Sequence, residues 1–248
     1  MQDIISKNEI QKHLDNPLLP IFTFDTIDST NSYAKELSED FALVVADSQT
    51  LGRGRLGRSF FSPAHSGVYM SLRVHIADLY ENIPFITTLS SVAVHKAVKK
   101  LYNIDCGIKW VNDILLNGKK LAGILCEICD NTHAVIGIGI NFAPNAMPQE
   151  IKDIVIHLPE NCNVTRNVLI AEITKNLLDD ISRLPSYDFM EYYKAYSVVI
   201  GRRVLCTRGN ERFSGLCTAI TDSGALVVNT SKGDIYLSSG EITLRVTD

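Results

Sequence analysis

The stretch Gly52-Arg53-Gly54-Arg55-Leu56-Gly57-Arg58 places three arginines and three glycines within seven residues. It follows a continuous apolar run, 41–46, which predicts a buried strand leading through Asp47 to Gln49. Glycines allow backbone N–H groups to approach a ligand closely, and arginines present planar donors that match phosphate or carboxylate. The stretch therefore predicts a site for a small anion. On these residues alone, a solvated basic loop or a nucleic-acid tail remains an alternative.

The composition is that of a soluble globular protein. The chain has 248 residues, of which 46% are hydrophobic and 21% charged, and its formal net charge is -4. This balance argues against duplex DNA as a partner, which needs a wide basic face. The first residues lack the pattern of a secretory signal, and no apolar run reaches the ~20 residues that span a bilayer. We therefore expect a cytoplasmic protein with no membrane contact.

A Cys-x-x-Cys pair, Cys126 and Cys129, lies in a run that reads as a strand. It has neither a second such pair nor two nearby histidines, which a zinc site of this type requires. Because the chain shows no export signal, its cysteines are expected to be reduced thiols.

Hydrophobic patterning predicts a mixed α+β fold. We expect strands at 21–24, 41–47, 67–74, 119–128 and 134–142, and helices at 30–37, 85–101, 168–184 and 189–196. The apolar run 108–116 meets the strand 119–128 at Asn117-Gly118, a strong hairpin turn. Gly137 and Gly139 alternate in the strand 134–142, so one face of that strand lacks side chains. Another backbone or a flat ligand is predicted to lie against this face.

The sequence pattern changes after Ser197. Five short strand-like runs separated by glycine turns follow, and they predict a small barrel. We therefore divide the chain into a catalytic domain, 1–197, and a C-terminal barrel, 198–248. The first ~20 residues are too few for a helix-turn-helix domain, which packs three helices.

Six motifs resemble, in order and spacing, those of the biotin–protein ligases, and together they cover nearly the whole chain from Ile21. They are Ser29-Thr30-Asn31, Gln49 with Gly52 to Arg58, Lys109-Trp110-Val111-Asn112-Asp113, Lys120-Leu121-Ala122-Gly123-Ile124-Leu125, Ile136-Gly137-Ile138-Gly139-Ile140-Asn141 and the closing Gly240-Glu241-Ile242-Thr243-Leu244-Arg245. Two positions depart from the pattern. Val111 stands where many members have proline, and Phe60 stands where many have tryptophan.

The resemblance implies a biotin–[biotin carboxyl-carrier protein] ligase in the catalytic-only form, a monomer or homodimer. Such an enzyme joins biotin to ATP, giving biotinyl-adenylate and pyrophosphate. It then transfers biotin to one lysine of a biotin carboxyl carrier domain, as in acetyl-CoA or related carboxylases. The fold implied is a mixed sheet with packed helices followed by an SH3-like barrel, with an arginine loop that stays flexible until ligand closes it.

The resemblance also implies roles for individual residues. Lys120 and Arg55 are expected to be catalytic. Biotin is expected to contact Ser29, Thr30, Asn31, Gln49, Gly52, Arg53, Gly54, Arg55, Lys120, Gly123 and Gly137. ATP or the adenylate is expected to contact Arg53, Arg55, Arg58, Phe60, Asn112, Asp113, Lys120, Asn141 and Arg245. Asp113 is also a candidate ligand for Mg²⁺ held mainly by the phosphates.

These residue types suit the chemistry. Ser29, Thr30 and Gln49 offer the neutral donors and acceptors that a buried urea needs, and the arginines and Lys120 suit anions brought into line. Plainer interpretations exist for single residues, such as a helix cap for Ser29, a surface lysine for Lys120 and a core aromatic for Phe60. For the whole chain, a lipoate ligase and a non-enzymatic nucleic-acid binder remain alternatives.

Overall fold

The computed structural model describes residues 3–76, 83–144, 147–160, 163–184, 188–238 and 242–247. Pro185, Gly240 and Glu241 lie outside these ranges. The larger part of the fold is a seven-stranded mixed sheet in the order β1-β2-β3-β7-β6-β5-β4. Its strands are β1 (Ile21–Ile27), β2 (Ala42–Gln49), β3 (Gly67–His75), β4 (Gly107–Lys109), β5 (Asp113–Leu116), β6 (Lys119–Ile128) and β7 (His133–Asn141).

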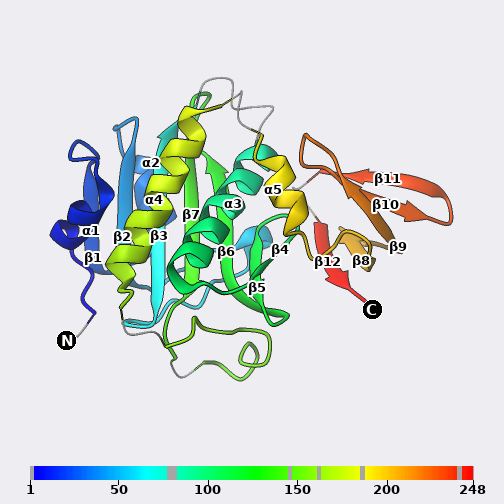
Figure 1. Ribbon diagram of the computed structural model, residues 1–248, viewed down its shortest axis with the longest axis horizontal. Helices are drawn as coiled ribbons and strands as arrows, with labels where there is room; N and C mark the ends of the chain where they lie inside the picture. The colour runs from blue at the N-terminus through cyan, green and yellow to red at the C-terminus, as the bar shows by residue number, and fades with distance from the viewer. Residues whose placement is uncertain are drawn as a thin grey trace.

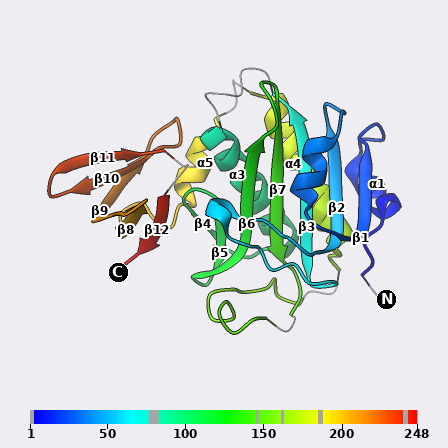
Figure 2. The ribbon, with the colours of Figure 1, turned by 180° about the vertical axis from the view of Figure 1, so that it is seen from behind.

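Helices cover both faces of this sheet. On one face, α3 (Ile83–Tyr102) and α4 (Arg166–Ser182) lie side by side, with α1 (Lys7–Leu14) against α4 (Figure 1). On the other face, the short α2 (Thr30–Glu36) packs on β2, β3 and β7 (Figure 2). Because β2, β3 and β7 lie between these layers, most of their residues are buried, which explains their nearly continuous apolar runs.

Two features differ from the sequence-based expectation. The run 108–116 is not one strand, because a turn at residues 110–112 folds it into the antiparallel pair β4 and β5. The N-terminal segment, read as short and polar, contains α1, whose Ile10 and Leu14 enter the core. Ser6 begins this helix by accepting a hydrogen bond from the backbone N–H of Glu9.

The C-terminal part is a five-stranded antiparallel sheet in the order β11-β10-β9-β8-β12. Its strands are β8 (Arg203–Arg208), β9 (Glu211–Ile220), β10 (Leu226–Thr230), β11 (Gly233–Leu237) and β12 (Ile242–Val246). All five predicted strands are present. Among the described residues, β11 and β12 are the two edges of the sheet and do not pair, so the expected β module is present but that pairing does not close it into a barrel.

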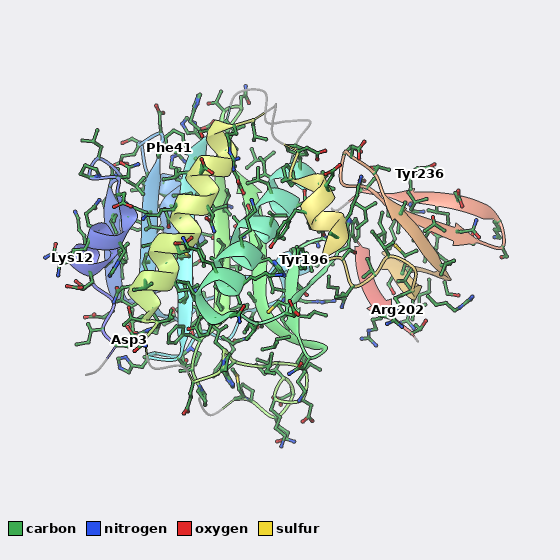
Figure 3. All side chains as sticks on the ribbon, viewed as in Figure 1. Asp3, Lys12, Phe41, Tyr196, Arg202 and Tyr236 are labelled. Carbon is green, nitrogen blue, oxygen red and sulfur yellow. The ribbon has the colours of Figure 1, made fainter. Side chains whose placement is uncertain are left out.

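The two sheets share one buried core, which includes Ile108 and Ile114 from the first and Val204 and Leu226 from the second. The short helix α5 (Met190–Ala195) leads between them, and Figure 3 labels Tyr196 and Arg202 along this passage. The buried indole of Trp110 donates a hydrogen bond to the carbonyl of Gly224 at 2.9 Å. Among the described residues, no helix is both long and apolar enough to cross a membrane.

Candidate active site

A pocket opens where the N-terminus of α2, the loop of residues 52–60 and strands β6 and β7 meet. Most of its wall comes from residues that the sequence predicted, namely Ser29, Thr30, Asn31, Gln49, Arg53, Gly54, Arg55, Phe60, Asn112, Lys120, Gly123 and Gly137. Met70, Ile124, Leu125, Ile138 and Gly139 add an apolar lining. Neutral polar groups and cations therefore share one concave site.

The neutral end of the pocket rests on a chain of buried side chains. Thr30 donates to Gln49 Oε1 through its backbone N–H at 2.9 Å and its hydroxyl at 3.1 Å. Ser71 Oγ lies 2.7 Å from Thr30 Oγ1 and 2.6 Å from Asn31 Oδ1. Gln49 Nε2 in turn donates to Ser62 Oγ at 3.0 Å, which fixes the orientation of the Gln49 amide.

A count of protons shows that this end is rich in acceptors. Three oxygen–oxygen contacts join Gln49, Thr30, Ser71 and Asn31, but Thr30 and Ser71 supply only two hydroxyl protons. Only one of the two Ser71 contacts can therefore carry its proton, so this end of the pocket has one lone pair more than it has protons to offer. Ser29 caps α2 by accepting from the Ser32 N–H, and its own hydroxyl proton has no acceptor among the described residues.

The cation loop, defined here as residues 52–60, is folded back on itself. The Phe60 N–H donates to the Gly52 carbonyl at 2.8 Å, and the Gly54 N–H donates to the Arg58 carbonyl at 2.7 Å. A side chain at Gly52 would place its Cβ 2.3 Å from the Phe60 carbonyl oxygen, so only glycine fits here. Gly52 thus shapes the loop and faces a shallower surface groove outside the main pocket.

Arg55 enters the protein from this loop and is half-buried. Its Nη1 donates to Asn112 Oδ1 at 3.0 Å, and Asn112 Nδ2 donates to the Ile124 carbonyl at 2.9 Å. Burial lowers the pKa of Arg55, and the negative charge of Asp113 opposes that shift. Arginine remains charged throughout the working pH range, so Arg55 brings a fixed positive charge to the pocket.

Lys120 lies on a bulge of β6. The pairing with β5 shifts between Ile114 and Leu115, so Leu121 has no partner in the ladder. Lys120 Nζ contacts Asp113 Oδ1 at 2.6 Å, in front of Gly123, where an added Cβ would approach Nζ to 2.8 Å. The bulge and Gly123 therefore let the ammonium group reach the pocket.

Asn141 was expected to contact ATP, but its amide nitrogen donates hydrogen bonds to the backbone of β6. It donates to the carbonyls of Lys120 and Leu121 at 3.2 and 3.1 Å. The backbone of Lys120 also pairs with Ile154 and Ile156, at 2.8 and 3.0 Å. The structure thus shows Asn141 supporting the bulge that carries Lys120, and Asn141 does not line the pocket.

The glycine face of β7 lies against two side chains. An added Cβ at Gly137 would lie 2.0 Å from Asn31 Oδ1, and one at Gly139 would lie 2.6 Å from the Phe60 ring. Both glycines also line the pocket, so the predicted contact of this face with a flat ligand stays a prediction.

A second hollow adjoins the pocket and holds further cations. Arg58, Lys109, Asp113 and Lys120 line it together with Phe60. Burial lowers the pKa of Lys109, and Asp113 raises it while Lys120, Arg245 and Arg58 lower it further. Exposed Arg245 on β12 is thus close enough to act electrostatically on this hollow. Lys109 was not among the predicted contacts, although it is the first residue of the motif Lys109-Trp110-Val111-Asn112-Asp113.

The described residues hold no group of three or more His, Cys, Asp or Glu that fits a metal ion. Asp113, the one predicted carboxylate, is engaged by Lys120. Cys126 has its pKa raised to about 11, first by burial, so it is a poor thiolate donor at neutral pH. Within the described part of the chain, these side chains therefore do not form a metal centre of three or more protein ligands.

Comparison with known proteins identifies both parts of the chain. Residues 23–141 match the model of the biotin/lipoate A/B protein ligase family, and residues 199–245 match the biotin protein ligase C-terminal domain. The chain is 33% identical to the bifunctional ligase/repressor BirA of Bacillus subtilis, over 97% of this chain and 79% of that protein. It is 27% identical to the biotin–[acetyl-CoA-carboxylase] ligase of Mycobacterium tuberculosis, over 82% and 79% respectively.

Solved structures agree with these matches. The biotin protein ligase of Aquifex aeolicus in complex with biotin and ATP superposes with a TM-score of 0.82 at 25% identity, covering 92% of this chain and 99% of that one. The sequence matches over both parts, the fold and a pocket that joins neutral polar groups to cations lead to one conclusion: this chain belongs to the biotin protein ligase family and is a biotin ligase.

Proposed function

We propose that this enzyme activates biotin as biotinyl-5′-adenylate, releases pyrophosphate and transfers biotin to a lysine of a biotin carboxyl carrier domain. The observation that carries the proposal is the polarity of the pocket. The pocket is lined both by the acceptor-rich group of Thr30, Gln49 and Asn31 and by the cations Arg55 and Lys120. Biotin has the same polarity, with a neutral urea at one end and a carboxylate at the other.

The neutral end suits the urea ring. A urea N–H can donate to the lone pair left over by the Thr30, Ser71 and Asn31 contacts. Its carbonyl can accept the hydroxyl proton of Ser29, which has no acceptor among the described residues. Because these groups are buried, an analogue that lacks either partner leaves a polar group unpaired at a cost of roughly 1–3 kcal/mol.

The cationic end suits the first chemical step. A carboxylate oxygen of biotin attacks the α-phosphorus of ATP, the bond to the β-phosphate oxygen breaks, and pyrophosphate leaves. Lys120 and Arg55 offset the repulsion between the two anions and stabilise the charge that develops, a form of catalysis that needs no side-chain nucleophile. Arg58 and Lys109, which line the adjoining hollow together with Lys120, are proposed to hold the phosphates. Arg53, which lies beside Asn31 through Glu127, is proposed to contact biotin.

In the second step the neutral amine of a carrier lysine attacks the acyl carbon of the mixed anhydride, and AMP leaves. Phe60, Asn112 and Arg245 are proposed to contact the nucleotide during both steps. Mg²⁺ would be held mainly by the phosphates of ATP, with Asp113 as a candidate carboxylate, because the described residues hold no group of three or more His, Cys, Asp or Glu that fits a metal ion. The C-terminal sheet, which begins after Ser197, is proposed as a C-terminal domain that packs on the shared core and helps to hold ATP or the carrier.

Pyrophosphate release tests the proposal directly. The protein is incubated with ATP and either biotin, lipoate or neither acid. We expect release with biotin alone, and then a gain in mass on a carrier domain whose acceptor lysine is intact but not on its Lys→Met counterpart. Release of pyrophosphate with lipoate but not with biotin would assign lipoate as the substrate. If neither acid causes release, the proposal is overturned.

A further inference from the structure

Glu127 lies near the end of β6 and outside the pocket, yet it binds two of the residues that line the pocket. Its Oε2 accepts from Asn31 Nδ2 at 2.9 Å, and its Oε1 contacts Arg53 Nη2 at 3.2 Å. Oε1 also contacts Lys35 Nζ at 2.6 Å. One carboxylate therefore joins α2 to the cation loop.

The contact with Asn31 fixes which way that amide points. Asn31 Nδ2 donates to Glu127 and, at 3.3 Å, to the Leu125 carbonyl, so both of its protons are directed to β6. Asn31 Oδ1 must then face Ser71, where it forms part of the acceptor-rich end. Rotating the amide would place its oxygen against the Glu127 carboxylate, which is repulsive.

The contact with Arg53 concerns the loop. Arg53 is about half exposed, whereas the side chain of Glu127 is 17% exposed. Burial on its own raises the pKa of Glu127, but the hydrogen bonds from Asn31 and Lys35 and the charges of Lys35 and Arg53 bring it below the ordinary value. The carboxylate is therefore ionised at neutral pH and attracts the first arginine of an otherwise self-repelling loop.

We propose that Glu127 is a positioning residue for biotin binding, which holds the Asn31 amide and the Arg53 side chain in their binding arrangement before biotin enters. This inference rests on the proposed placement of biotin in this pocket. Glu127 contacts neither reacting group, so its loss affects how readily the site assembles. Its loss leaves the charges that act on the reacting carboxylate in place.

Glu127→Gln tests the proposal, because glutamine keeps the shape and removes the charge. We expect the biotin Kd and the KM for biotin to rise about tenfold, while kcat for pyrophosphate release stays within about threefold. Trypsin should cut the empty variant at Arg53, Arg55 or Arg58 several times faster than it cuts the wild type. Combined with Arg53→Gln, the Glu127 change should add much less than it does alone.

Glu172→Gln is the matched control. Glu172 is similarly shielded, with 14% of its side chain exposed, and pairs with Lys100 at 2.8 Å away from the pocket. This variant should leave the KM, Kd and loop cleavage at wild-type values. A rise in KM in both variants would indicate general destabilisation and would overturn a positioning role.

Lys35→Met keeps the proposal testable should Glu127→Gln fail to fold. Lys35 and Arg53 both contact Glu127 Oε1. Without Lys35, Arg53 no longer competes for this oxygen, so Glu127 should hold the cation loop more firmly and trypsin should cut it more slowly. Faster cleavage would contradict the proposal. If the wild type itself binds no biotin, the proposed function fails. If the wild type binds biotin and Glu127→Gln binds it equally well, this inference alone fails.

Discussion

Lys120 and Lys119 form a pair of adjacent lysines with different surroundings. Lys119 is exposed, whereas Lys120 reaches the pocket and contacts Asp113. Lys120→Ala should slow pyrophosphate release by ~10²-fold or more, the size seen when one charge-stabilising donor is removed. Biotin binding without ATP should change by no more than about threefold, since the urea end is untouched. Discontinuous assays, quenched at set times, measure the rate of pyrophosphate release.

Lys119→Ala is the control for this prediction and should behave as the wild type. Adenylation by Lys120→Ala within a few-fold of the wild-type rate would remove Lys120 from the catalytic role. A large and equal loss in both variants would point to damage of the β5–β6 hairpin rather than to chemistry.

His95 predicts a dependence of stability on pH. It is fully buried, with its ring nitrogens 2.9 Å from the Tyr192 hydroxyl and the Cys106 carbonyl. Burial lowers its pKa from 6.5, with Lys99 lowering it further and Cys106 and Asp105 opposing. The unfolded chain thus binds the proton more tightly, so the contribution of His95 is complete above about pH 6.5 and is lost as the pH falls below it.

Urea unfolding between about pH 7.5 and pH 5 measures this contribution. The free energy of unfolding of the wild type should fall over this range by more than that of His95→Gln, which cannot gain a proton. Parallel pH profiles for the two proteins would show that the imidazole is not the titrating group.

At the level of single residues, the sequence predicted the side chains that line the pocket better than the side chains that orient them. Ser29, Gln49, Arg55 and Lys120 lie in local motifs, so their types and spacing were informative. Ser71 and Ser62 were missed, because each acts through partners distant in sequence, such as Thr30 and Gln49. Contacts of that kind exist only after the sheet has formed.

Among the elements, β7 offers a prediction through its two glycines. Gly137→Ala pushes a methyl group into the Asn31 amide, whose nitrogen and oxygen are both engaged. We expect the KM for biotin to rise at least tenfold with a smaller change in the KM for ATP. Gly139→Ala displaces the Phe60 ring instead and should raise the KM for ATP more than that for biotin.

Steady-state kinetics with each substrate varied in turn measure both constants, and the two variants serve as controls for each other. If both variants change the two KM values in the same way, Gly137 does not act mainly on biotin and Gly139 does not act mainly on ATP.

The elements themselves were largely predictable because long apolar runs fix their types. The strands 119–128 and 134–142 and the helices 85–101 and 168–184 were found within about two residues. The turn at residues 110–112 was missed, since Trp110 and Val111 are buried and read as part of a strand. The bulge at Leu121 left no local signal, because it depends on pairing with β5.

At the scale of the whole molecule, Trp110 joins the two sheets. Trp110→Phe leaves the Gly224 carbonyl without its donor and should lower the free energy of unfolding by roughly 1–3 kcal/mol. Because Trp110 is the only tryptophan, circular dichroism rather than fluorescence should follow urea unfolding. An unchanged midpoint would show that this contact adds no stability.

A chain that ends at Ser197 tests what the second sheet supplies. It loses Val204, Leu226 and other members of the common core, so its melting temperature should fall. Where it folds, at low temperature, it should bind biotin but transfer it poorly to a carrier domain. Transfer at the normal rate by the folded fragment would contradict a role for the C-terminal sheet.

The bond between Trp110 and Gly224 also has a consequence for the timing of synthesis. The two residues are 114 positions apart, which a ribosome covers in roughly 6–23 s at about 5–20 residues per second. During this interval the larger sheet can form, but the Trp110 indole lacks its hydrogen-bond acceptor because Gly224 has not yet been translated. The contact between the two sheets thus forms late in synthesis, and a nascent chain halted before Gly224 should be a preferred substrate for chaperones.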